Sequence, residues 1–91
     1  MVYPREVLNK LKWSEGKSFE DATIWYIHRG APGDIRTIYG RDVKNLGPGF
    51  FETSDSTIPY HRILRIEYMG EVVFDKELEA ELKKSGVSSN P

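Results

Sequence analysis

The sequence predicts an α+β fold: a small, mostly antiparallel sheet of four to five strands, with an N-terminal and a C-terminal helix. Three observations support this prediction. Apolar residues recur at helical spacing near both ends of the 91-residue chain, β-branched and aromatic residues are frequent in the middle, and turn-forming residues separate the short apolar runs. We expect one domain over residues 1–87 and a disordered tail over residues 88–91.

The first helix is expected over residues 5–12. Pro4 suits the first helical position, because the amide hydrogen that proline lacks would have no partner there. Val7, Leu8 and Leu11 follow at helical spacing and would form the apolar face of the helix. The polar residues 14–21 are expected to form a loop.

Two strands are expected after this loop. Residues 22–28 (ATIWYIH) are apolar on both faces, which favours a central strand, and residues 35–39 (IRTIY) form a shorter second strand after a turn rich in glycine and proline. Residues 40–45 are expected to form a brief helical turn, and residues 50–52 a short strand. Pro59 cannot donate a ladder hydrogen bond, so it is expected at a strand start or a sheet edge.

The last two strands are expected to form a hairpin. The alternation after residue 62 places Leu64, Ile66 and Tyr68 on one face, with charged residues between them on the other. Residues 69–70 would form a two-residue loop, which pairs Val73 with Ile66.

A final helix is expected after the hairpin. Asp75 can cap it, Leu78 and Leu82 share one of its faces, and Gly86 is placed to end it.

Composition narrows the possible functions. The chain has no cysteine, which excludes disulfides and cysteine-based zinc sites and favours a cytoplasmic location. Its two histidines alone do not make a zinc site, so we expect no metal and no cofactor. No apolar run is long enough to cross a membrane, and the N-terminus lacks the apolar segment of a signal peptide. The formal net charge of −1 argues against a broad basic face for duplex nucleic acid.

The first candidate site is the segment 28–34 (HRGAPGD), where a strand runs into a glycine-bracketed turn. Glycine lets the backbone approach a ligand closely, and successive amide groups in such a turn can bind an anion. The alternative is a tight hairpin turn with a solvated arginine and a hydrogen-bonded histidine. The candidate phosphate-binding residues of this segment are His28, Arg29, Gly30, Gly33 and Asp34.

The second candidate site is the segment 58–63 (IPYHRI). If the strand alternates here, His61 shares a face with Ile63 and Arg62 shares one with Leu64. Arg62 would then point toward the core or toward a pocket at the end of the sheet, where it needs a carboxylate or a ligand. Tyr60 is the preferred candidate to stack on a nucleobase. The structural alternative is an ion pair between Arg62 and one of three carboxylates, namely Asp34, Asp42 or Glu52.

The two sites share a feature: the chain has only two histidines, and each is followed by arginine. Arginine can grip a phosphate with two hydrogen bonds, and an imidazole can donate a third. The same groups could instead cleave a cyclic phosphate, with His28 and His61 as acid and base.

Four segments in order carry a family resemblance: residues 8–13 (LNKLKW), 26–34 (YIHRGAPGD), 58–63 (IPYHRI) and 70–74 (GEVVF). Through them the chain resembles the RNA cyclic group end recognition domain family, with Phe74 where tryptophan is expected in relatives. The resemblance implies a stand-alone archaeal cytoplasmic protein. It also implies binding of RNA ends that carry a 2′,3′-cyclic phosphate, in RNA repair or processing, and it maps this role onto His28, Arg29, Asp34, His61 and Arg62.

Three hypotheses follow. We favour an RNA-end binding module without turnover, in which Arg29 and Arg62 hold the phosphate and RNA-repair or processing proteins are further partners. The second hypothesis is a phosphoesterase that uses His28 and His61. The third is a protein-interaction module that uses an acidic helix over residues 75–84 and an exposed sheet edge. The oligomeric state is left open.

Overall fold

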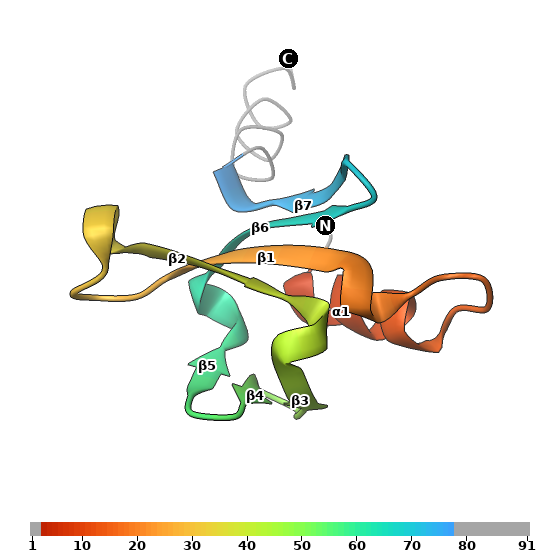
Figure 1. Cartoon of the computed structure of the whole chain (residues 1–91), viewed down its shortest axis with the longest axis horizontal. Helices are drawn as coiled ribbons and strands as arrows, with labels where there is room; N and C mark the ends of the chain where they lie inside the picture. The colour runs from red at the N-terminus through yellow and green to blue at the C-terminus, as the bar shows by residue number, and fades with distance from the viewer. Residues whose placement is uncertain (1–2, 78–91) are drawn as a thin grey trace, which may run out of the picture.

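A computed structural model describes residues 3–77, in which seven strands form two antiparallel sheets accompanied by one α-helix (Figure 1). The four-stranded sheet has the strand order β2-β1-β6-β7, and the three-stranded sheet has the order β3-β4-β5. The helix and the strands are α1 (Pro4–Trp13), β1 (Ala22–Ile27), β2 (Ile35–Tyr39), β3 (Val43–Leu46), β4 (Phe50–Thr53), β5 (Thr57–Pro59), β6 (Ile63–Tyr68) and β7 (Glu71–Asp75). The helical spacing of Val7, Leu8 and Leu11, with Pro4 before them, thus predicted the bounds of α1 to within one residue at each end.

The four-stranded sheet confirms the prediction that the first strand is central. β1 lies between β2 and β6 and is antiparallel to both. Ile24 pairs with Ile38 on one side and with Ile66 on the other, and all three side chains are buried. One face of β1 packs into the core, and on the other face the guanidinium of Arg65 on β6 lies over the ring of Trp25.

Two irregularities in the sheet, one in β6 and one in β7, correct the expected pattern of this hairpin. The β1–β6 register shifts between Trp25 and Tyr26, so that Ile63 and Ile66 are both buried, while Leu64 is only half-buried. A second shift between Ile66 and Glu67 pairs Ile66 with Phe74, where simple alternation predicted Val73. A bulge inserts one extra residue into a strand and therefore reverses the facing of the residues beyond it.

The second sheet is the main departure from the expected fold, which had a single sheet of four to five strands. The predicted helical turn over residues 40–45 is limited to a 3-10 turn, η3 (Gly40–Asp42), and β3 follows it directly. β4 was expected as a short strand and does pair with β3 and β5. Pro59 ends β5, an edge strand of this sheet, as its missing amide hydrogen requires.

The predicted C-terminal helix falls largely outside the described residues. Asp75 is the last residue of β7, and the description ends two residues later. The positions expected on the helix face and at its end, Leu78, Leu82 and Gly86, are therefore not described, and neither is the expected tail over residues 88–91. No helix within residues 3–77 is long and apolar enough to span a membrane.

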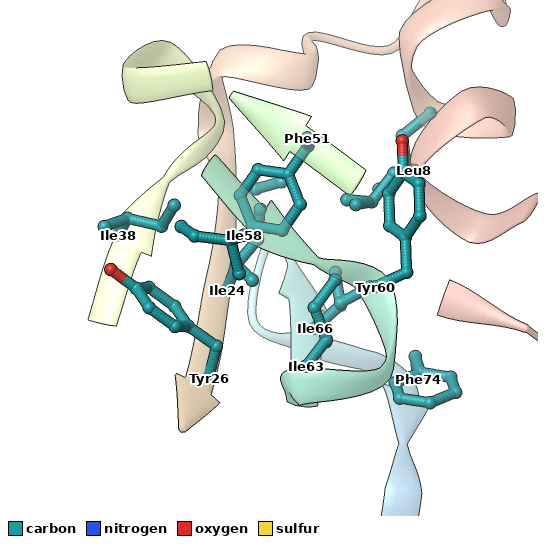
Figure 2. Packing of buried hydrophobic residues seen from close by; sticks show 12 residues of the cluster. Leu8, Ile24, Tyr26, Ile38, Phe51, Ile58, Tyr60, Ile63, Ile66 and Phe74 are labelled. Carbon is teal, nitrogen blue, oxygen red and sulfur yellow. The ribbon is translucent and has the colours of Figure 1, made fainter. Parts of the chain in front are cut away.

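The core lies between the two sheets and α1, and Figure 2 shows its packing. Aromatic rings form its centre: Tyr26 and Phe51 meet edge to face at 6.5 Å between ring centroids, and Phe51 and Tyr60 are 5.9 Å apart. Such pairs add stability beyond the area that they bury. The buried cluster is Leu8, Leu11, Ala22, Ile24, Tyr26, Ile38, Phe51, Ile58, Tyr60, Ile63, Ile66 and Phe74.

Candidate functional site

The pairing of β1 with β6 brings both His-Arg dipeptides to one end of the four-stranded sheet. His28 and Arg29 directly follow β1, and His61 and Arg62 directly precede β6. Because the strands are antiparallel, the end of β1 lies beside the start of β6, where Tyr26 pairs with Ile63. In Figure 1 the β1–β2 hairpin extends beyond the sheet at this end.

The turn after β1 is held by its own backbone. The amide of His28 donates to the carbonyl of Asp34 at 2.8 Å, and the amide of Asp34 donates to the carbonyl of Ala31 at 2.8 Å. Gly30, Gly33 and Asp34 have φ angles of 96°, 66° and 58°. Aspartate tolerates this left-handed conformation because its short side chain can bond to nearby backbone, and here Asp34 Oδ1 accepts from the amide of Gly30 at 3.3 Å. Asp34 thus shapes the turn.

His28 contacts a buried ring at this turn, whereas Arg29 is exposed. The imidazole of His28 is half-buried and meets the ring of Tyr26 edge to face, 6.1 Å between centroids. The side chain of Arg29 extends into solvent. Beside them lies a shallow pocket of about 520 Å³ lined by residues 28–31 and 35–37, which we call the hairpin pocket.

Arg36 is a cationic residue of the hairpin pocket that sequence reasoning missed. It pairs with Tyr26 across β1 and β2, so both side chains leave the same face of the sheet. The pKa of Asp55 lies below its usual value, chiefly because the side chains of Thr53 and Ser56 donate to its carboxylate, and Arg36 adds a smaller electrostatic effect. The sequence did offer one signal for Arg36: it stands two positions before the apolar Ile38, and residues two apart in a strand lie on the same face.

The second dipeptide lies on a 3-10 turn, η4 (Tyr60–Arg62), and not on an extended strand. Tyr60 is only 7% exposed, and its hydroxyl donates to the carbonyl of Gly47 at 2.8 Å. Desolvation raises the pKa of Tyr60, and the nearby charge of Arg5 partly opposes this. Tyr60 is therefore a core residue packed on Phe51 (Figure 2), which corrects its expected role as a stacking surface.

His61 and Arg62 are both exposed on η4, so the expectation that Arg62 points toward the core is wrong. A 3-10 turn has about three residues per turn, and burial of Tyr60 leaves the next two side chains outside. The predicted ion pair with Asp34, Asp42 or Glu52 is not required for an exposed guanidinium. The carbonyl of His61 accepts from Lys76 Nζ at 2.6 Å.

The two histidines line different pockets. His61 borders a second pocket of about 400 Å³, lined by residues 3–6, 48–49 and 60–61, which we call the helix pocket. His28 borders the hairpin pocket. Within residues 3–77, no three His, Asp or Glu side chains are grouped so that they could hold a metal ion.

The family model described as the MJ1316 RNA cyclic group end recognition domain matches residues 1–76. The chain belongs to this family. The segments 26–34 and 58–63, which carry the two His-Arg dipeptides, both fall within the matched MJ1316 domain.

Curated relatives of this MJ1316 domain chain are archaeal UPF0248 proteins. One from Thermococcus sibiricus is 41% identical over 75 residues, which cover 81% of this chain and 85% of the relative. One from Pyrococcus abyssi is 42% identical over 62 residues, covering 68% and 74%. One from Methanococcus maripaludis is 35% identical over 74 residues, covering 79% and 96%. No solved structure matches the chain significantly.

Proposed function

We propose that this protein binds RNA termini that carry a 2′,3′-cyclic phosphate and releases them unchanged. The observation that carries the proposal is the hairpin pocket, where His28, Arg29 and Arg36 surround a turn of exposed backbone at the end of the sheet. Three cationic or donor side chains gather there in a chain whose formal net charge is −1. The name of the matched domain supports a terminal cyclic group as the ligand.

The chemistry of the pocket suits a terminal phosphate. A cyclic phosphate carries one negative charge over two free oxygens, and the planar forks of Arg29 and Arg36 can each offer paired donors to them. The imidazole of His28 can donate a further hydrogen bond, and its contact with Tyr26 restricts the ring. Gly30 and Gly33, both exposed and at positive φ, let the RNA approach the backbone closely.

The second dipeptide extends the proposed site across the sheet end. Arg62 is exposed on η4, beside the last residues of β1, and would hold the phosphate that links the terminal nucleotide to its neighbour. His61 would donate to the same strand. Asp34 keeps the turn in shape through its bond to Gly30.

Binding without turnover is favoured by the separation of the histidines. Acid–base cleavage of a cyclic phosphate needs two groups within hydrogen-bond reach of the same phosphorus centre. His28 and His61 line different pockets, which supports a holding role. Cyclic phosphates arise when a ribose 2′-hydroxyl attacks the adjacent phosphodiester. We therefore place the protein in RNA repair or processing in the cytoplasm, with proteins of those pathways as further partners.

The test is a fluorescence titration with three matched RNA oligonucleotides that end in 2′,3′-cyclic phosphate, 3′-phosphate or 3′-hydroxyl. The cyclic end should bind most tightly. Arg29→Gln should weaken that binding by about tenfold or more, because a hydrogen bond to a charged group contributes about 1.5–3 kcal/mol. Arg62→Ala should also reduce it while the protein stays folded.

The matched control is Arg41→Gln, since Arg41 is exposed and lies over Tyr39 at the far end of β2. It should bind like the unmodified protein. Equal affinity for the three ends would overturn the proposal. Conversion of the cyclic end during long incubation with stoichiometric protein would establish the phosphoesterase instead.

A further inference from the structure

We propose that the helix pocket binds the nucleobase next to the RNA terminus, so that the protein binds a single-stranded RNA end more tightly than a free cyclic nucleotide. This inference rests on the proposed function and adds a second subsite to it. The helix pocket, about 400 Å³ in volume, lies between the first turn of α1, the β3–β4 turn and η4.

The walls of the helix pocket offer flat, apolar surfaces. Tyr3, which is 54% exposed, stands at the rim, and Pro4 and Pro48 line the sides. Tyr60 closes the floor, where its hydroxyl is already bonded to Gly47. Exposed aromatic rings bind the faces of unpaired bases, and this stacking tolerates any base. Tyr3 takes the stacking role that the sequence assigned to Tyr60.

The same pocket carries donors and an acceptor for the edge of a base. Arg5 and His61 line it as donors, and Glu6 lines it as an acceptor for amino groups. Arg5 and Tyr60 both line the pocket, and the charge of Arg5 partly opposes the rise in the pKa of the Tyr60 phenol. A few polar groups around an apolar cavity are typical of a small-ligand site.

The turn η4 connects the helix pocket with the proposed RNA end site. η4 contributes Tyr60 and His61 to the helix pocket and carries the exposed Arg62. η4 also leads directly into β6, beside the end of β1 from which the hairpin pocket begins. A strand whose terminus occupies the hairpin pocket would therefore cross η4 before its preceding base reaches the helix pocket.

The occupant we assign is a base of single-stranded RNA. Bases of a duplex are stacked on each other and cannot enter a pocket without being unpaired. A free nucleoside 2′,3′-cyclic phosphate would fill the hairpin pocket and leave the helix pocket empty. The two ligands therefore differ by the contacts of Tyr3, Arg5 and Glu6.

The experiment compares Tyr3→Ala with Tyr39→Ala on two ligands, a nucleoside 2′,3′-cyclic phosphate and a trinucleotide with the same cyclic end. Tyr39 is the matched control because it is 47% exposed and pairs with Thr23, at the opposite end of β1 from His28. Tyr3→Ala should weaken trinucleotide binding by about tenfold and leave the cyclic nucleotide unaffected. Tyr39→Ala should change neither.

Amide NMR spectra give an independent readout on the unmodified protein. The trinucleotide should shift the amide signals of Tyr3, Arg5, Glu6 and Gly49, and the cyclic nucleotide should shift only those of the non-proline residues in 28–37. If Tyr3→Ala binds the trinucleotide normally, or loses both ligands equally, the inference is overturned.

The two proposals can fail separately. If Tyr3→Ala does not change trinucleotide affinity but Arg29→Gln abolishes the preference for the cyclic end, the base subsite is refuted and the end site remains supported. If RNA binds without preference for its end, and this binding is weakened by Tyr3→Ala, the end site is refuted and the base pocket remains supported. Absence of RNA binding overturns both.

Discussion

Gly40 leaves no room for a side chain. It is buried at the start of η3, against the short turn η1 (Phe19–Asp21). A Cβ atom at position 40 would lie 1.8 Å from the carbonyl oxygen of Phe19 and 2.7 Å from its carbonyl carbon. These are backbone atoms, so they can yield only if one of the two turns moves.

Gly40→Ala should therefore destabilise the protein by about 3 kcal/mol, at the upper end of the usual cost of overpacking. Urea denaturation followed by circular dichroism would measure the loss. Gly49→Ala is the control, because a Cβ atom there would meet nothing within 4 Å. Equal stability of the two variants would contradict the packing of η1 on η3.

At the scale of single residues, the sequence was sufficient where a side chain of suitable chemistry has informative neighbours in the chain. His28 and Arg29 were recognised because they adjoin a glycine-rich turn, and the structure places them beside a pocket. Arg36 and Tyr3 were missed, since their relevance comes from neighbours supplied by other elements. Tyr60 was misjudged because sequence alone could not distinguish an aromatic residue beside a histidine from one in the core.

The β6–β7 hairpin turns through two residues in the left-handed conformation. Met69 has a φ of 53° and Gly70 a φ of 81°, and Tyr68 pairs with Glu71 across the loop. Both residues at positive φ are typical of a type I′ turn, which matches the twist of the strands. The sequence prediction of a two-residue loop is confirmed, and methionine is a poor residue for its first position.

Met69→Asn should stabilise the hairpin by about 1 kcal/mol, because asparagine adopts the left-handed conformation more readily than methionine. Met69 is 73% exposed, so little packing is lost. For a domain of this size the melting temperature should rise by about 4–8 °C, measured by circular dichroism. Met69→Leu should leave it unchanged. A melting temperature for Met69→Asn at or below that of the unmodified protein would refute the prediction.

Elements were predictable where the signal was local. α1 and β2 follow from the periodicity and turn residues of their own segments, and the structure confirms both. β3 was missed because Val43–Leu46 is only four residues long and carries two adjacent polar residues between its apolar ends, so it shows no alternation by itself. The bulges of β6 and β7 were missed because a register shift depends on which strands pair, and pairing cannot be read from one segment alone.

Charge is the property that matters at the scale of the whole molecule. The chain is nearly neutral, with 13 basic and 14 acidic residues. Cations around the proposed RNA site, Arg29, Arg36 and Arg62, are exposed and come from three separate segments of the chain. Such a protein can hold a few phosphates locally and lacks the excess charge that attracts long nucleic acids.

The affinity for a cyclic-ended oligonucleotide should therefore depend weakly on salt. With two to three phosphates held, the logarithm of the association constant should fall with the logarithm of salt concentration at a slope of about −2. Titrations over a series of salt concentrations would measure it, and Arg29→Gln should make the slope shallower by about 0.7. A slope steeper than about −4 would indicate a broad electrostatic interface and contradict a focused site.

The placement of the two His-Arg dipeptides at one end of the sheet depends on the pairing of β1 with β6, two strands that thirty-five residues of chain separate. Closing so long a loop is entropically costly, and strand pairings of this kind form late and slowly in folding. The hairpin turn can form from local contacts, whereas its neighbour η4 arrives only with β6. Recognition of an RNA strand would thus be acquired at the end of folding, which makes RNA affinity a sensitive reporter of how much of the chain has reached its native topology.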